Sequence, residues 1–169
     1  MSFLVEGDRV QLSDAKGNKN TIILQAGKEF HTHKGGIPHD SIIGLPEGSM
    51  VSSTNGTTYM VLRPLLLDHI LAMPRGAAVI YPRDSAQIVV EADIFPGAVV
   101  VEAGVGSGGL SSYLLRAIGV RGVLHSFERR EDFAQTARKN VDSYFPEPPT
   151  NWNITVGDLQ VAAHEQTNL

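Results

Sequence analysis

An acidic residue followed by clustered glycines is the part of this sequence best suited to bind a nucleotide. The apolar run 98–101 reaches Glu102, and the chain then passes through Gly104, Gly106 and Gly108 before an amphipathic stretch begins. Glycines permit a sharp turn after a strand and a backbone approach to a ligand that any Cβ would block. The start of the following helix would offer free N–H groups to that ligand. The segment therefore predicts a cofactor-binding loop.

Two further acidic residues follow apolar runs. Glu128 ends the run 122–128, about twenty positions after the last of these glycines, where a carboxylate can accept hydrogen bonds from ribose hydroxyls. Asp158 follows the β-like run 152–156 and could accept a hydrogen bond from an adenine amino group, although a helix cap or turn residue is an equally good interpretation. Three acids at strand ends favour S-adenosyl-L-methionine as the cofactor.

The same glycines leave a second cofactor open. Gly104, Gly106 and Gly109 also fit the G-x-G-x-x-G spacing of NAD-binding folds. In those folds the glycine strand usually opens the domain, whereas here about a hundred residues precede it. An NAD-dependent oxidoreductase is therefore the weaker alternative, and it would require nicotinamide binding.

The elements around the loop predict an α/β domain over residues 76–169. Strands are expected at 98–102, 122–128 and 152–156, with helices at 109–118 and 131–144. This βαβαβ order is the first half of a doubly wound, Rossmann-like sheet. Because little sequence follows the third strand, we expect a C-terminally truncated form of such a domain. An earlier helix is expected to begin at Asp84, with Gln87 completing a reciprocal cap.

The N-terminal residues 1–75 predict a small β-rich domain. Strands are expected at 8–13 and 21–25, and a hairpin at 49–62 around Asn55-Gly56, a dipeptide that favours a type I′ turn. A short helix at 64–72 would join the two domains.

Three histidines lie in the segment 30–40, which is rich in glycine and is expected to form an exposed loop. Neutral imidazoles at His31, His33 and His39 could ligate a metal, but no acidic or cysteine ligand is suitably clustered with them. We therefore expect no metal site, and a loop that binds a partner or simply connects strands.

Composition sets broad limits on the function. The 169 residues carry a net charge of −4, are 42% hydrophobic and 19% charged, and include no cysteine. The basic residues are scattered and form no stripe typical of a nucleic-acid surface. No apolar stretch of about 18 residues and no signal peptide is evident. We expect a soluble, cytoplasmic protein with no membrane segment.

Taken together, the motifs resemble the N-terminal part of the bacterial and archaeal tRNA (adenine-N1)-methyltransferases, especially the actinobacterial kind. The similarity covers nearly the whole chain, in five segments: 30–44, 80–84, 102–108, 126–128 and 151–158. The resemblance implies a class I methyltransferase fold, S-adenosyl-L-methionine as cofactor, and methylation of a T-loop adenosine in tRNA. It also implies a homotetramer.

The resemblance implies roles for individual residues. The cofactor would lie against Gln87, Glu102, Gly104, Gly106, Ser107, Gly108, Leu110, Glu128 and Asp158, and Tyr81 would lie near the target base or, equally well, serve as a core or hinge aromatic. The family's carboxylate after the fourth strand, which contacts the target adenine, has no counterpart in this sequence. We therefore expect this chain to be inactive alone. A non-catalytic oligomerisation or tRNA-docking module is the alternative.

Overall fold

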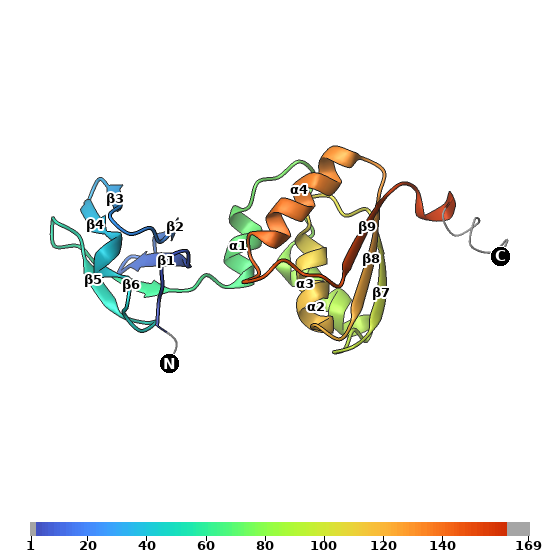
Figure 1. Ribbon diagram of the computed structural model, residues 1–169, viewed down its shortest axis with the longest axis horizontal. Coiled ribbons are helices and arrows are strands. Elements are labelled where there is room, and N and C mark those ends of the chain that lie inside the picture. Colours follow the sequence, from blue (N-terminus) through green and yellow to red (C-terminus); the bar gives the residue numbers. More distant parts are fainter. Residues whose placement is uncertain (1–2, 162–169) are drawn as a thin grey trace. The chain divides into compact units, whose positions relative to one another are not determined.

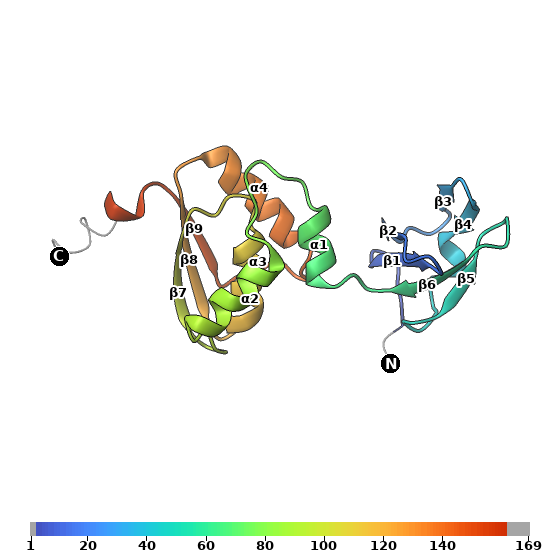
Figure 2. The same cartoon turned by 180° about the vertical axis from the view of Figure 1, so that it is seen from behind.

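The computed structural model describes residues 3–161, which form two compact units (Figures 1 and 2). The first unit spans Met1–Leu65 and the second spans Leu66–Leu169. Each unit has its own hydrophobic core, and each is described separately below.

The first unit is built from antiparallel strands. Its larger sheet has the order β2-β1-β6-β5, and a separate hairpin pairs β3 with β4. The elements are β1 (Arg9–Asp14), β2 (Lys19–Ile23), β3 (Glu29–Thr32), β4 (Gly35–Pro38), the 3-10 helix η1 (His39–Ser41), β5 (Met50–Ser52) and β6 (Thr58–Leu62). Alternate residues such as Val10, Leu12 and Val61 are fully buried, so one face of the sheet carries the core.

Two expectations for this unit were wrong. The segment 30–40 is mostly the β3–β4 hairpin rather than an exposed loop, and His39 is buried, with its Nδ1 accepting a hydrogen bond from the amide of Gln25 at 3.0 Å. The turn at Asn55-Gly56 is not type I′, because Gly56 has a positive φ of 79° and Asn55 does not. The amide of Thr54 donates a hydrogen bond to the carbonyl of Gly36, and Thr54 Oγ1 accepts one from the amide of Gly36. These bonds favour a connection between β5 and β6 that is longer than a two-residue turn.

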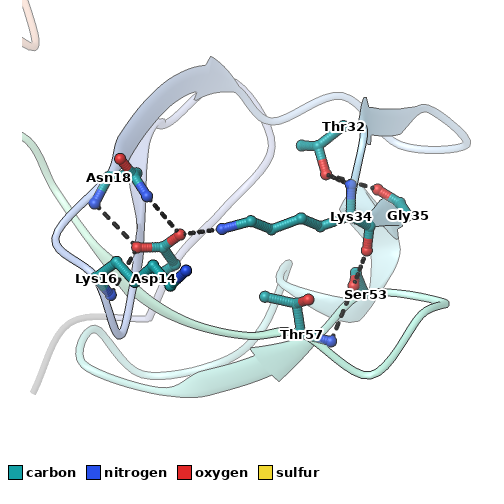
Figure 3. A network of polar contacts seen from close by, with 8 residues as sticks. All are labelled: Asp14, Lys16, Asn18, Thr32, Lys34, Gly35, Ser53 and Thr57. Carbon is teal, nitrogen blue, oxygen red and sulfur yellow. Dashed lines mark hydrogen bonds and ion pairs between the residues drawn. The ribbon is translucent and has the colours of Figure 1, made fainter.

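A polar network ties the β3–β4 hairpin to the larger sheet (Figure 3). The carboxylate of Asp14 forms an ion pair with Lys34 and accepts hydrogen bonds from Asn18 and from the amide of Lys16. The carbonyl of Lys34 accepts a 2.6 Å hydrogen bond from Ser53 Oγ. Residues far apart in the sequence are thereby held together at the edge of the core.

The second unit contains a parallel sheet with the order β7-β8-β9. Its elements are α1 (Leu66–Ala72), α2 (Pro82–Glu91), β7 (Val99–Ala103), α3 (Gly109–Ile118), β8 (Val123–Glu128), α4 (Glu131–Asp142) and β9 (Trp152–Val156). The helices lie on one side of the sheet in both views (Figures 1 and 2). On the other face Val99 and Val101 are 69% and 57% exposed.

Two helices differ from expectation. Helix α2 begins at Pro82 with Tyr81 as its N-cap, so Asp84 lies within the first turn and does not cap the helix. Proline is well suited to the first helical position because its missing N–H would have no partner there. Helix α1, which we expected as a hinge helix within residues 1–75, belongs to the second unit and packs with Val79, Tyr113 and Tyr144. No helix in residues 3–161 has the length and apolarity needed to cross a membrane.

Candidate cofactor site

The carboxyl ends of the three parallel strands form the candidate site. Parallel strands end at one edge of their sheet, so residues that follow them in sequence lie side by side there. A cavity of about 390 Å³ opens at this edge, a size within the usual range for small-molecule sites. It is lined by Ala103, Gly104, Phe127, Glu128, Arg129, Gly157, Asp158, Leu159 and Gln160. The structure thus brings together three predicted site residues, Gly104, Glu128 and Asp158.

The glycine loop is shaped by left-handed backbone and held by Glu128. Gly104, Gly106 and Gly108 have φ values of 84°, 57° and 83°, which residues with a side chain rarely adopt. The amide of Gly106 donates a 3.0 Å hydrogen bond to Glu128 Oε2, and the amide of Arg130 donates one of 3.0 Å to Oε1. A carboxylate offers about four acceptor positions, so Glu128 keeps capacity for ligand hydroxyls.

Glu102 lies buried below the loop and is 6% exposed. Its Oε2 accepts hydrogen bonds from Ser111 Oγ at 2.7 Å and from Ser126 Oγ at 2.8 Å. Its Oε1 is buried and has no hydrogen-bond partner within the described part of the chain. Burial raises the pKa of Glu102, as does the nearby charge of Glu128, while the two serine hydrogen bonds act against this rise.

Asp158 has an ordered carboxylate at the far side of the cavity. Its Oδ2 pairs with Arg129, and its Oδ1 accepts a 2.8 Å hydrogen bond from the amide of Gln160. These two donors, the amide first, hold the pKa of Asp158 below its usual value. Asp158 is therefore ionised near neutral pH and is available as an acceptor.

Three other predicted residues, at the end of the loop and the start of α3, face the interior of the unit. The hydroxyl of Ser107 accepts hydrogen bonds from the amides of Gly76 and Ala77, at 3.2 and 3.3 Å. Gly108 packs against α4, and half-buried Leu110 packs on the core of the unit. These residues support the loop from inside the unit and do not line the cavity.

Tyr81 and Gln87 also lie outside the cavity lining. Tyr81 precedes α2 and is 54% exposed. Gln87 is exposed on α2, where its side chain donates a 2.8 Å hydrogen bond to Glu91. Their predicted roles in the site stay predictions.

The sequence interpretation missed the serines that hold Glu102. Ser126 faces Glu102 from β8, and its hydroxyl accepts a 2.8 Å hydrogen bond from the indole of Trp152. One signal was present: Ser126 interrupts the inward-facing positions of an apolar strand, where a hydroxyl needs a buried partner.

The described residues contain no group of three or more histidine, cysteine, aspartate or glutamate side chains placed to hold a metal ion. The arrangement instead offers two carboxylates that line the cavity, Glu128 and Asp158, a backbone loop with left-handed glycines, and one buried carboxyl with an orphaned oxygen. These groups suit a ligand with hydroxyl, amino and ammonium donors.

Comparison with protein families matches nearly the whole chain. Residues 3–51 match the TrmI-like N-terminal family, and residues 60–163 match the family described as tRNA methyltransferase complex GCD14 subunit. A tRNA (adenine(58)-N(1))-methyltransferase from Thermus thermophilus is 36% identical over 155 residues, which are 92% of this chain and 60% of that protein. The archaeal tRNA (adenine(57)-N(1)/adenine(58)-N(1))-methyltransferase of Methanocaldococcus jannaschii is 34% identical over 130 residues.

Solved structures show the same fold. A SAM-dependent O-methyltransferase from Thermotoga maritima superimposes with a TM-score of 0.84 at 32% identity, covering 94% of this chain and 58% of that one. The tRNA (m1A58) methyltransferase of Aquifex aeolicus gives a TM-score of 0.79 at 29% identity, covering 94% and 60%. The expected architecture, a small β domain followed by part of a class I methyltransferase fold, is confirmed. The chain spans about 60% of the length of the Thermus relative.

Proposed function

Because this chain belongs to the TrmI family of tRNA (adenine-N1)-methyltransferases, we propose that its second unit binds S-adenosyl-L-methionine at the ends of β7, β8 and β9. The reaction served by this site is methylation of N1 of the T-loop adenosine in tRNA. The observation that carries the proposal is that the glycine loop, Glu128 and Asp158 meet at one cavity.

Each group has a role that its chemistry supports. Glu128 accepts hydrogen bonds from the ribose hydroxyls, and Asp158 accepts one from the adenine amino group. The loop at Gly104 and Gly106 lies against the amino-acid end of the cofactor, and the unpartnered Oε1 of Glu102 provides a negative potential toward its ammonium group. The fit is supported by left-handed glycines and by a buried acceptor that lacks a donor.

The bound cofactor supplies a methyl group on a sulfonium sulfur, and attack by adenine N1 is an in-line displacement that depends mainly on positioning. The target base must also be turned out of the folded tRNA, at a cost of a few kcal/mol. Tyr81 is proposed to lie near that base. The described residues provide one side of the pocket and no carboxylate after a fourth strand, so we propose that they bind cofactor without supporting fast transfer by themselves.

Isothermal titration with S-adenosylhomocysteine tests the cofactor proposal without relying on turnover. We expect a Kd in the micromolar range or tighter, and a loss of about tenfold in the Glu128→Gln variant, which keeps the side-chain shape and removes an acceptor for the ribose. NAD serves as the control ligand and should not bind. A folded sample that binds NAD and not S-adenosylhomocysteine would overturn the proposal.

Binding to tRNA and assembly into a homotetramer are proposed from the family relationship. Gel-shift assays with unmodified tRNA, with and without S-adenosylhomocysteine, separate the enzyme from a docking module. A docking module binds tRNA equally in both conditions. Transfer of labelled methyl groups to tRNA at an ordinary enzymatic rate would contradict the expectation that this chain alone is inactive.

A further inference from the structure

Asn140 of α4 is a buried side chain that joins three parts of the second unit, and it is 4% exposed. Its Nδ2 donates hydrogen bonds of 2.9 Å to the carbonyl of Ser107, in the glycine loop, and to the carbonyl of Pro74. The backbone carbonyl oxygen of Asn140 lies 3.0 Å from Nε2 of His69 on α1. Because a carbonyl only accepts, Nε2 of His69 carries a hydrogen. The two N–H groups of the Asn140 side-chain amide are both used, one by Ser107 and one by Pro74.

The segment 76–80 that follows Pro74 lies directly against the glycine loop. A Cβ added at Gly109 would lie 2.9 Å from Cγ1 of Val79, and one added at Gly106 would lie 3.6 Å from Cβ of Ala77. A side chain at Gly109 would collide with Val79, whereas a Cβ at Gly106 would make only ordinary van der Waals contact with Ala77. The loop and the segment therefore share one packed boundary, which is tightest where Gly109 meets Val79.

Ser107 and Asn140 both hold the glycine loop in place by hydrogen bonds. The Ser107 hydroxyl accepts hydrogen bonds from the amides of Gly76 and Ala77, while the Ser107 carbonyl is held by Asn140. An error of about 1 Å in the position of a binding loop is enough to reduce affinity or rate severalfold or more. Asn140 does not line the cavity, and neither do Ser107 and Pro74, to which its side chain donates.

We propose that Asn140 is a positioning residue for the amino-acid end of the cofactor: it fixes the glycine loop by bridging the carbonyls of Ser107 and Pro74. This inference rests on the proposed cofactor function. The role requires two N–H donors at one buried point, which an asparagine amide supplies and a carboxylate does not. Loss of the hydrogen bond to Ser107 would leave a buried carbonyl without this donor, whereas the carbonyl of Pro74 is only partly buried.

The test compares two ligands with two matched variants. S-Adenosylhomocysteine and 5′-methylthioadenosine share the adenosine and the sulfur, and only the first carries the amino acid. Asn140→Asp removes both side-chain donors, the one to Ser107 in the loop and the one to Pro74. Asn151→Asp is the control, because Asn151 also donates two hydrogen bonds to backbone carbonyls, those of Gly119 and Gly122, away from the glycine loop.

By titration calorimetry of the full chain, we expect Asn140→Asp to weaken S-adenosylhomocysteine binding about tenfold, which equals about 1.4 kcal/mol. Its affinity for 5′-methylthioadenosine should change less than about twofold, because adenosine lies against Glu128 and Asp158. Asn151→Asp should leave the ratio of the two affinities unchanged. Equal weakening of both ligands by Asn140→Asp, or the same ratio change in the control, would overturn the inference and leave the proposed function standing.

Measurements on the wild-type chain decide two further cases. If it binds neither ligand, the proposed function is overturned and the inference with it. If Asn140→Asp does not fold, amide hydrogen exchange of the wild-type chain decides instead. S-Adenosylhomocysteine should then slow exchange at Gly76 and Ala77, whose amides bond to Ser107, and 5′-methylthioadenosine should not. Exchange that is unchanged by both ligands would refute the positioning role.

Discussion

Folding and ligand binding favour opposite protonation states of Glu102. Its carboxyl is buried with one oxygen unpartnered, and burial raises its pKa. Folding therefore favours the protonated form, and this contribution to stability is lost as pH rises from the unfolded-state pKa, about 4.3, through the higher folded-state pKa. A ligand ammonium group would favour the charged form. Such conflicts between stability and function are typical of binding sites.

We predict that Glu102→Gln leaves the second unit as stable as the wild type or more stable by about 1 kcal/mol at pH 7, because an uncharged amide costs less to bury. The same variant should bind S-adenosylhomocysteine more weakly. Thermal unfolding measured between pH 4 and pH 7 checks the first part, since the wild type should lose stability across this range relative to the variant. A variant that is less stable at every pH would contradict this reading of Glu102.

At the scale of elements, the contact between α3 and α4 depends on Gly108. Its φ is 83°, and an added Cβ would lie 3.1 Å from the carbonyl oxygen of Ala137 and 3.2 Å from Cγ2 of Val141. Gly108→Ala adds left-handed backbone strain of about 1–2 kcal/mol and a packing cost of about 1–3 kcal/mol. We expect a clearly lower melting temperature for the second unit and weaker cofactor binding.

The matched control for that prediction is Gly97→Ala. Gly97 also has a positive φ, of 98°, but a Cβ there meets no atom within 4 Å. Its variant should therefore lose only the strain contribution. Equal melting temperatures for the two variants, measured by calorimetry, would show that the close approach of α4 adds nothing.

Periodicity predicted the second unit well because its elements are set by local pattern. The strand at 152–156 and the helix at 109–118 were placed with the bounds that the structure gives them. The start of α2 was misplaced because Asp84 resembled a cap, while the preceding Pro82 had already fixed the first turn. The β3–β4 hairpin was missed because glycines and histidines gave no alternating apolar pattern.

For the candidate site, the sequence predicted the residues that follow strands and missed those that depend on packing. Glu128 and Asp158 could be assigned because parallel strands align their ends. Asn140 could not, because its partners Ser107 and Pro74 lie 33 and 66 positions away and are brought together only by the packed helices. From the sequence alone, a polar residue on an amphipathic helix is expected on the solvent-exposed face.

At the scale of the whole molecule, the first unit should be sensitive to acid through Asp14. Hydrogen bonds from Asn18 and the ion pair with Lys34 hold the pKa of this buried carboxyl well below its usual value. Its contribution to stability is therefore complete above the unfolded-state pKa, about 3.9, and is lost as pH falls toward the folded-state value.

We predict that Asp14→Asn lowers the stability of the first unit at pH 7 and makes it less dependent on pH between 5 and 2. Calorimetry of the full chain measures this unit, and the fluorescence of Trp152, the single tryptophan, follows the second unit independently. An unchanged pH dependence in the variant would show that another carboxyl controls acid unfolding.

The second unit also has an apolar sheet face that favours self-association. Val99 and Val101 on β7 are 69% and 57% exposed, and β7 is one of the two edge strands of the sheet in residues 3–161. Exposed apolar edge strands promote pairing between chains. We predict that replacing both valines by threonine weakens concentration-dependent association severalfold without preventing folding. Sedimentation velocity over a range of concentrations checks this, and a monomeric wild type would contradict it.

The contiguity of the two units has a consequence for biosynthesis. Every strand of the first unit lies within Met1–Leu65, so no later segment is needed to complete its sheet. Domains generally fold as units during translation, the N-terminal one first. This unit can therefore finish folding on the ribosome while the parallel strands, whose partners lie more than twenty positions apart, are still being synthesised. A nascent chain arrested after Leu65 has left the exit tunnel would already resist proteolysis.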